Sequence, residues 1–330
     1  MCIQCDVISR RAVLAGLLGA AGTLAGMGAA RAACWTPAEL KAAPGEALRR
    51  RPTAADAIAR PTPAAALAPL TGTRAGIIRR VDLPAGEKAV AFTFDLCQTV
   101  SPVAGYDGAI VDYLRAQDVP ATFFACGRWL LTHKVRAEQL AADQRFLIAN
   151  HSYDHPDLHG APAARVQNEI LLTEAALATT RSAAASVCAT GAASAPMRLF
   201  RFPYGSCAPA DVAAVNAIGS VVIQWDTVSG DPDGTSAKAI IRNVFSTLRP
   251  GSIVVMHGNG RGTHTAEALA TIIPRLKGEG YRFLTVADLI KAGKPVAANA
   301  CYITRPGDTA QYDRKLLHTS AGRAPVARRL

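Results

Sequence analysis

The chain has 330 residues, half of them hydrophobic, and a formal net charge of +11. This composition suits a globular α/β protein with enough apolar residues for a sizeable core. Eight basic and two acidic residues between 291 and 330 hold much of the positive charge, and no basic patch is interleaved with aromatic residues, so nucleic acid is not expected as a partner.

The first 32 residues have the pattern of an export signal. The twin arginine Arg10-Arg11 precedes nineteen uncharged residues of mild hydropathy, and a small-residue cleavage pattern follows at 30–32. This arrangement is typical of the twin-arginine export route. A membrane anchor is the alternative, since about 20 apolar residues can span a bilayer. We interpret residues 1–32 as a signal peptide, which predicts an exported, periplasmic or cell-envelope protein.

The flanks of the ordered region are of low complexity. Residues 33–80 are rich in alanine and proline and have no sustained apolar period, which predicts a linker or a loosely packed extension. The folded domain is expected over 81–292. The basic tail, 293–330, is either a solvated, flexible end or a segment that holds the protein near anionic envelope polymers.

Between these flanks, short apolar runs alternate with helical patterns. The runs that have the length and composition of buried strands are 88–95, 120–125, 145–149, 197–202, 220–225, 251–257 and 281–285. The helical patterns cover 107–117, 134–142, 163–181, 208–217, 235–248, 263–278 and 286–291. This alternation predicts an α/β fold with a parallel sheet that is covered on both faces.

Polar side chains lie at the carboxyl ends of five predicted strands. They are Asp95, His151 with His155, Arg201, Asp226 and His257. In parallel α/β folds this rim is where sites are built. Contributions from five strands favour a closed or nearly closed barrel, and no glycine-rich phosphate loop follows the first strand, which disfavours a nucleotide enzyme.

Two of these residues have the spacing of metal ligands. His151 and His155 are four residues apart, so on a helical turn they would share a face and bind one ion, although Pro156 limits that turn. Two imidazoles with a carboxylate and an open position suit divalent zinc. The guanidinium of Arg201 could hold a carboxylate in place, or it could form an ordinary surface ion pair.

Five motifs occur in this order: TFD (93–95), HSYDH (151–155), RFPYG (201–205), WDTVSGD (225–231) and VMH (255–257). In order and spacing they resemble the motifs of the polysaccharide deacetylases, the NodB-homology or carbohydrate esterase 4 family. The resemblance covers about residues 88–290 and implies a distorted, partly open (β/α)7 barrel. It also implies a hydrolase that uses a divalent metal to remove acetyl groups from an N-acetylated glycan such as chitin or peptidoglycan.

The resemblance also implies roles for individual residues. Asp95 matches the general base, and Arg201 matches the residue that orients its carboxylate. His151 and His155 match metal ligands. These residue types suit amide hydrolysis, because a metal polarises the carbonyl group and a carboxylate takes a proton from the attacking water.

Three further roles follow from the same resemblance. The backbone N–H of Tyr204 would donate to the oxyanion, and His257 would protonate the leaving nitrogen as general acid. Asp231 would correspond to an acid that tunes this machinery. The segment around Asp231, 229–234, is also a plain turn signal, so both interpretations stay open.

Leu96 departs from the family pattern, in which the base is followed by a second aspartate that is the third metal ligand. Leucine cannot bind a metal, and the expected glycine after it is Cys97. The conceivable substitutes are Asp107, His159, the thiolate of Cys97 and Asp95 itself. Asp95, which would then leave the base role to another group, is slightly favoured over loss of the metal. The predicted metal ligands are thus His151, His155 and Asp95. The alternative is a non-catalytic glycan-binding protein on a decayed deacetylase scaffold.

Six cysteines follow the signal segment, and an even number in an oxidising compartment predicts disulfides. The expected positions of the strands and domain ends favour the pairs Cys97–Cys126, Cys188–Cys207 and Cys34–Cys301. Several free buried thiols are the alternative.

Overall fold

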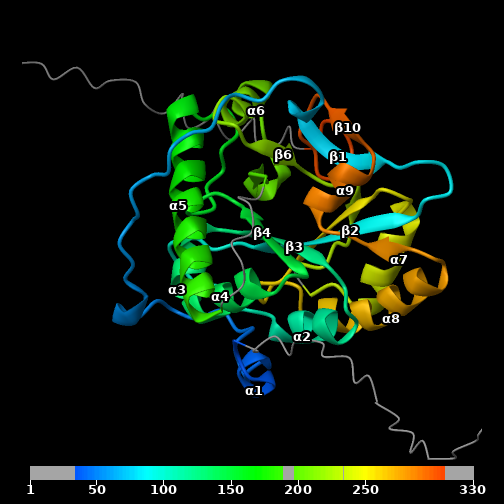
Figure 1. Cartoon of the computed structure of the whole chain (residues 1–330), viewed down its shortest axis with the longest axis horizontal. Coiled ribbons are helices and arrows are strands. Elements are labelled where there is room, and N and C mark those ends of the chain that lie inside the picture. The colour runs from blue at the N-terminus through cyan, green and yellow to red at the C-terminus, as the bar shows by residue number, and fades with distance from the viewer. Residues whose placement is uncertain (1–33, 189–196, 233, 309–330) are drawn as a thin grey trace, which may run out of the picture. The chain divides into compact units, whose positions relative to one another are not determined.

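The computed structural model describes residues 34–188, 197–232 and 234–308 (Figure 1). The predicted signal peptide, 1–32, lies outside these ranges, as does the end of the predicted basic tail. Within the described ranges, no helix combines the length and the apolar character needed to cross a bilayer.

A mostly parallel sheet forms the centre of the described part of the chain. Its strands are β1 (Ile77–Asp82), β2 (Ala89–Leu96), β3 (Ala121–Ala125), β4 (Phe146–Asn150), β5 (Leu199–Phe200), β6 (Val221–Ile223), β7 (Thr227–Val228), β8 (Ile253–His257), β9 (Arg282–Phe283) and β10 (Lys294–Ala298). The order is β10-β1-β6-β5-β4-β3-β2-β8-β7, and β9 pairs with β2. Each predicted strand is present within a few residues of its expected bounds.

The sheet curls into a partly open barrel. Neighbouring strands run parallel, apart from the antiparallel pair β1 and β10. A hydrogen bond from the Val81 N–H to the Gly251 carbonyl oxygen, 2.9 Å, brings β1 close to the start of β8. The predicted α/β class and partly open barrel are confirmed.

Strands β1, β7 and β10 were not predicted. β1 has two arginines within its apolar run, IIRRVD, and β10 contains Pro295 and lies at the edge of the sheet, where a missing N–H is tolerated. The pair brings together two segments that were expected to be a linker and a tail. Its antiparallel register, in which Val81 faces Pro295, joins residues that no local pattern connects.

Helices cover the outer face of the sheet. They are α2 (Gly108–Ala116), α3 (Gly127–Thr132), α4 (Lys134–Ala142), α5 (Ala163–Val187), α6 (Pro209–Asn216), α7 (Ala237–Thr247) and α8 (Thr265–Gly278). Two others are α1 (Pro37–Leu40), in the N-terminal segment, and α9 (Val286–Ala292), which contacts β1 and β2. All seven predicted helices are present, whereas α1 and α3 were not predicted.

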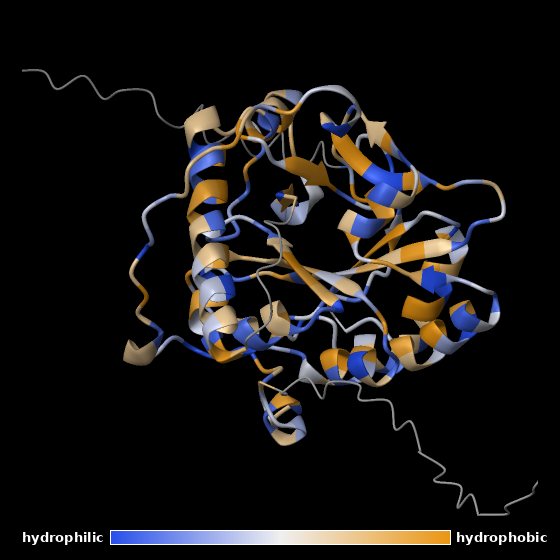
Figure 2. Ribbon diagram, in the orientation of Figure 1, coloured by the Kyte–Doolittle hydropathy of each residue, from blue (hydrophilic) through white to orange (hydrophobic). Residues whose placement is uncertain are grey.

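The curled sheet separates two apolar clusters. The outer cluster joins Phe94 and Leu96 of β2 to the helices α2, α3, α7 and α8. The inner cluster includes Ala91 of β2, Ile253 of β8 and Leu289 of α9. Figure 2 shows strands that are mostly apolar in colour and helices that carry both colours, as expected for a sheet buried on both faces.

The N-terminal segment 34–76 lies along the folded domain. Its backbone N–H groups at Ala64 and Leu67 donate to the carbonyl oxygens of Leu171 and Ile218, at 3.0 and 3.1 Å. Glu46 accepts from the Arg136 guanidinium at 2.8 and 2.9 Å. The segment that was expected to be a linker or loose extension is therefore tied to the domain along its length.

The predicted disulfide pairs are wrong. The structure pairs Cys34 with Cys188 and Cys207 with Cys301, while Cys97 and Cys126 are free, buried thiols. Chain order along the barrel did not reveal that the N-terminal segment reaches the end of α5. It also did not reveal that the segment after β10 reaches the loop after β5. Cys97 and Cys126 follow neighbouring strands, but Cys126 packs in the outer core and Cys97 lines a pocket.

Candidate active site

Except for Arg201, which is buried and binds Asp95, the predicted site residues line one pocket of about 380 Å³ at the carboxyl ends of the strands. This volume falls in the usual range for small-ligand sites. The polar residues that line it are Asp95, Cys97, His151, His155, Ser229, Asp231, His257 and Arg261. These residues come from the ends of several strands, which confirms the prediction that the strand ends meet at one rim.

The end of β2 places Asp95 in this pocket and Leu96 outside it. Side chains alternate between the faces of a strand, and Leu96 is fully buried in the outer cluster with Phe94. Cys97, one residue further, again lines the pocket. A leucine at position 96 therefore fills the core beneath the helices and takes no space from the site.

Arg201 holds the Asp95 carboxylate in place. Its guanidinium donates to Asp95 Oδ1 at 2.7 Å and to the Thr93 hydroxyl at 2.8 Å. Both ion-pair side chains are almost completely buried, which excludes the surface ion pair considered above. Burial alone would raise the pKa of Asp95, but the Arg201 charge and the nearby imidazoles lower that pKa below its usual value. The carboxylate is therefore ionised, and its Oδ2 remains on the side of the imidazoles.

His151 presents one ring nitrogen to the pocket. Its Nδ1 lies 2.9 Å from the backbone carbonyl oxygen of Arg201, which only accepts, so Nδ1 carries the proton. Nε2 then has a free lone pair, 3.5 Å from Cys97 Sγ and 3.7 Å from Asp95 Oδ2. Burial lowers the pKa of His151, which favours the neutral imidazole that binds metals.

His155 reaches the same place by an irregular loop. The two rings lie 4.9 Å apart, edge to face, but residues 151–155 form no helical turn, so the predicted shared helical face is wrong. Ser152 and His155 have positive φ values of 65° and 54°, a strained conformation that is common at functional sites. Burial, with the other imidazoles, lowers the pKa of His155 well below its usual value.

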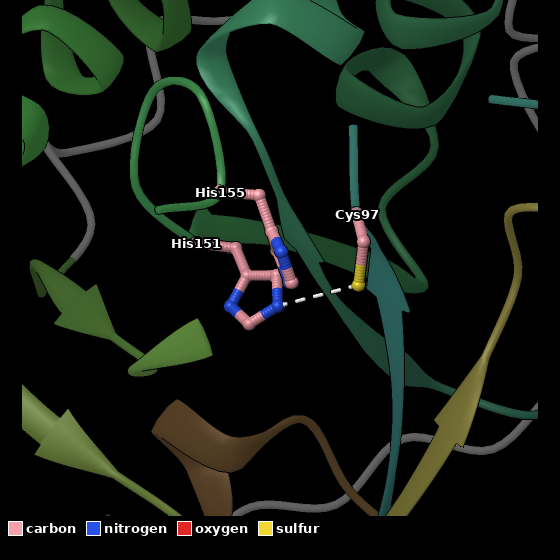
Figure 3. Close-up of side chains that lie close together, drawn as sticks. All are labelled: Cys97, His151 and His155. Atoms are coloured by element: carbon pink, nitrogen blue, oxygen red, sulfur yellow. Dashed lines mark hydrogen bonds between the residues drawn. The ribbon is translucent and has the colours of Figure 1, made fainter. Parts of the chain in front are cut away.

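Together these side chains form a donor set that fits a divalent metal. Ligand atoms of Cys97, His151 and His155 all lie within 4.8 Å of one another, and Figure 3 shows the two rings and the thiol converging. A second such cluster comprises Asp95, Cys97 and His257. Imidazole nitrogens and a thiolate are typical zinc ligands.

Two of the conceivable substitutes for a third ligand do not join either cluster. Asp107 lies immediately before α2, where its backbone N–H donates to the Gly258 carbonyl oxygen at 2.9 Å. His159 interacts through Nδ1 with the Ser206 hydroxyl at 3.0 Å. Asp95 and Cys97 are thus the remaining candidates among those considered.

His257 ends β8, where it is the register partner of Asp95 on β2. Asp231 holds it in place. The imidazole Nδ1 and the backbone N–H of His257 contact Asp231 at 2.9 and 2.7 Å. The carboxylate also accepts from the hydroxyls of Ser229 and Thr265. Burial alone would lower the pKa of His257, but Asp231 raises that pKa above its usual value. The predicted contact between Asp231 and the site is therefore present.

An apolar wall closes one side of the pocket. Trp225 and Ile303 both line it, and the Trp225 indole N–H donates to the Ile303 carbonyl oxygen at 2.8 Å. The Cys207–Cys301 disulfide fixes this C-terminal segment. Ile303 was not predicted as a site residue, because it lies in the aperiodic tail, and only the position of Cys301 indicated that the tail returns to the domain.

Tyr204 lies at the mouth of the pocket. Its side chain is 43 % exposed, its ring packs 4.6 Å from that of His155, edge to face, and its backbone has a positive φ of 60°. The Pro203–Gly205 turn, with Gly205 packed on Trp225, sets this unusual geometry.

Comparisons with known proteins agree with this geometry. The profile of the family described as polysaccharide deacetylase matches residues 82–223. A chitooligosaccharide deacetylase from Bradyrhizobium sp. is 30% identical over 209 residues, which cover 59% of this chain and 88% of that protein. The chain belongs to the polysaccharide deacetylase family.

Other relatives of this family include both enzymes and a pseudoenzyme. A peptidoglycan-N-acetylglucosamine deacetylase from Bacillus cereus is 29% identical over 64% of this chain and 71% of its own length. The chain spans 39% of the related deacetylase PgdA from Listeria monocytogenes. The solved structure of the Bc1960 peptidoglycan N-acetylglucosamine deacetylase has 27% identity and a TM-score of 0.55 over 68% of this chain and 96% of that one. BA3943, a carbohydrate esterase 4 pseudoenzyme from Bacillus anthracis, has 25% identity and a TM-score of 0.53 over 66% and 69%.

Proposed function

We propose that this protein is an exported, metal-dependent deacetylase that removes N-acetyl groups from a glycan such as peptidoglycan or a chitin-like oligosaccharide. The observation that carries the proposal is the buried Asp95–Arg201 pair, with Asp95 Oδ2 directed toward the ring of His151. A carboxylate held in this way beside two neutral imidazoles is suited to deprotonate a water molecule.

Five side chains carry the metal-dependent part of the proposal. His151 and His155 would hold a divalent cation, with zinc the best match for their nitrogens, and a third ligand would come from Asp95 or Cys97. The cation would polarise the acetamide carbonyl and lower the pKa of the attacking water. Arg201 keeps Asp95 ionised and fixed in orientation, so that Oδ2 is free to accept a proton.

The neighbouring strand β8 supplies the acid. His257, held at Nδ1 by Asp231, would donate the Nε2 proton to the nitrogen of the leaving amine, so that a neutral amine and acetate form. The Tyr204 backbone N–H would donate to the oxyanion, a contact typically worth about 3–4 kcal/mol.

The apolar wall limits the size of the acyl group. Trp225 and Ile303 close the pocket on one side, and their side chains suit a methyl group that is removed from water. The sugar would then extend past Tyr204, whose exposed ring at the mouth offers a stacking surface.

A second function is favoured by one observation. Leu96 stands where the family resemblance implies a metal-binding aspartate, and the structurally similar BA3943 is described as a pseudoenzyme. In that case the pocket would bind a glycan without cleaving it. The exposed ring of Tyr204 serves this function as well as the first, while the retained Asp95–Arg201 and His257–Asp231 pairs serve only the first.

Acetate release from defined glycans separates the two functions. The full chain, supplied with zinc, is expected to release acetate from N-acetylated chitooligosaccharides or from peptidoglycan fragments. A zinc-loaded chain that binds these glycans in calorimetry but releases no acetate from any of them would support the glycan-binding function and contradict the deacetylase. The predicted export and the contact of the basic tail with anionic envelope polymers are parts of the same proposal, tested by fractionating cells.

A further inference from the structure

The third protein ligand of the proposed metal can be assigned from the end of β2. We propose that the thiolate of Cys97 completes the metal site with His151 and His155, and that Asp95 stays outside the coordination shell as the base. This inference rests on the proposed function, because it concerns the same pocket. In this interpretation the third metal ligand is not lost with the aspartate at position 96, because the next residue, Cys97, provides it.

The alternation of β2 explains why position 97 takes this place. Asp95 and Cys97 both line the pocket, and Leu96 between them is wholly buried in the outer cluster. The Leu96 side chain lies in the apolar core, whereas Cys97 already lies among the two imidazoles. Cys97 therefore offers the ligand atom that Leu96 lacks.

The distance between Cys97 Sγ and His151 Nε2 is compatible with two ligands of one zinc ion. Zinc–sulfur and zinc–nitrogen bonds of about 2.3 and 2.0–2.1 Å at a tetrahedral angle place the two ligand atoms about 3.6 Å apart. Cys97 Sγ lies 3.5 Å from His151 Nε2. An oxygen and a nitrogen ligand would lie about 3.4 Å apart, and Asp95 Oδ2 is at 3.7 Å.

The surroundings of Asp95 point the same way. Its Oδ1 already accepts from Arg201, and its ligand atoms cluster with Cys97 and His257, the residue on the acid side of the pocket. Cys97 belongs to both clusters. A metal held by Cys97, His151 and His155 would leave the Asp95 carboxylate next to the site, where it can act as the base.

Cys126 is a buried cysteine with no proposed role in metal binding, and its surroundings differ from those of Cys97. Its Sγ donates to the backbone carbonyl oxygen of His151 at 3.2 Å, and it packs in the outer core with Leu96. Both thiols are free, while the four other cysteines of the described residues form disulfides. Only Cys97 of the two free thiols belongs to a cluster with imidazole nitrogens.

Two chemical consequences follow from a thiolate ligand. A thiolate carries the same single negative charge as the carboxylate it replaces, so the net charge of the loaded site and its effect on water are retained. Thiolate and imidazole ligands favour zinc over magnesium, calcium or manganese, which favour oxygen. We therefore expect a zinc enzyme with three protein ligands and one open position, the arrangement of catalytic zinc sites.

Cobalt substitution tests the assignment without relying on activity. The full chain carries Cys2→Ser and Cys5→Ser, so that no thiolate outside the described residues contributes, and Co²⁺ is titrated into metal-free protein. A thiolate bound to Co²⁺ gives a charge-transfer absorption in the near ultraviolet that a carboxylate does not give. We expect this band in the parent and in the matched control Cys126→Ser, and its loss in Cys97→Ser.

Zinc affinity provides the second measurement. Substitutions outside the coordination shell already cost about 10- to 100-fold in metal affinity, so Cys97→Ser is expected to cost more than about 100-fold. Cys97→Asp should restore most of the affinity without restoring the band. X-ray absorption of the zinc-loaded parent should show one sulfur neighbour, a result that needs no variant to fold.

The possible outcomes are distinct. Cobalt bound by the parent without a thiolate band, or a band that survives in Cys97→Ser, would overturn the Cys97 assignment and leave the proposed deacetylase standing with Asp95 as ligand. A parent that binds neither cobalt nor zinc would instead contradict the metal-dependent function itself.

Discussion

The two faces of β2 have opposite chemistry. Toward the helices, Phe94 and Leu96 are completely buried in an apolar cluster. Toward the barrel interior, Thr93 and Asp95 bind the Arg201 guanidinium, and Cys97 continues that face into the pocket. Residues that are adjacent in sequence thus lie in different environments, because successive side chains of a strand point to opposite faces of the sheet.

This difference changes how a departure from a family motif should be interpreted. A missing aspartate next to the base suggests that the metal site is lost when the residues are compared one by one. The structure assigns position 96 to the core and position 97 to the pocket. A motif residue should therefore be judged by the face it occupies as well as by its number.

The largest expected effect is on the polar face. Asp95→Asn removes the proposed base and should lower kcat for acetate release by about 10³-fold, within the usual range for general bases. The matched control is Asp118→Asn, the same change at an exposed carboxylate, which should alter kcat less than about twofold. Circular dichroism checks that both variants fold. A folded Asp95→Asn variant with nearly normal activity would contradict the role of Asp95.

Substitutions of Leu96, on the apolar face of β2, should change the free energy of unfolding more than the activity. Leu96→Asp restores the family residue but buries a carboxyl group without a partner, so the free energy of unfolding should fall by about 4 kcal/mol. Leu96→Met, which keeps the apolar volume, should cost less than about 1.5 kcal/mol. Urea denaturation measures both. A stable Leu96→Asp variant that binds zinc more tightly than the parent would show that position 96 reaches the site.

A smaller effect is expected in the pH profile. Asp231 raises the pKa of His257 against the effect of burial, and a general acid works only while protonated, so kcat/KM should fall at alkaline pH as His257 loses its proton. Asp231→Asn removes the charge that raises this pKa, so the alkaline limb should move to lower pH.

The control for this shift is Asp157→Asn, at an exposed carboxylate in the neighbouring loop, which should leave the limb in place. An unchanged alkaline limb in Asp231→Asn, with a folded protein, would exclude His257 as the group that titrates there.

The smallest effect concerns the apolar wall. Ile303→Ala enlarges the pocket beside Trp225, so the preference for acetyl over propionyl groups, measured as a ratio of kcat/KM values, should fall by about tenfold. Ile303→Val should shift the ratio in the same direction by less. A ratio that does not respond to either change would place the acyl group elsewhere.

The local patterns predicted most of the fold. The buried strands and the helices were found because their apolar periods are clear over β2, β8 and α5, and the strand-end rule brought Asp95, His151, Arg201 and His257 together. The pair β1 and β10 was missed, because it depends on non-local pairing of two weakly apolar segments. The disulfides failed for the same reason, since both join the domain to segments without a pattern.

The site itself was predicted less completely. The position of Cys97 in the pocket follows from the alternation that starts at Asp95, so that signal was present in the sequence. The spacing of His151 and His155 predicted that their rings lie close together, and they do. The predicted helical turn is absent, because Ser152 and His155 take positive φ values that no residue preference predicts. Ile303 depends on the return of the tail, which only the structure reveals.

Zinc-dependent acetate release tests the proposed chemistry of the pocket most directly. The chain is stripped of metal with a chelator, zinc is returned in measured amounts, and acetate release from an N-acetylated chitooligosaccharide is followed against bound zinc. We expect no activity without metal and a rate that rises in proportion to zinc up to one ion per chain. Full activity in the stripped chain, or none at one bound zinc on any N-acetylated glycan, would contradict a metal-dependent deacetylase.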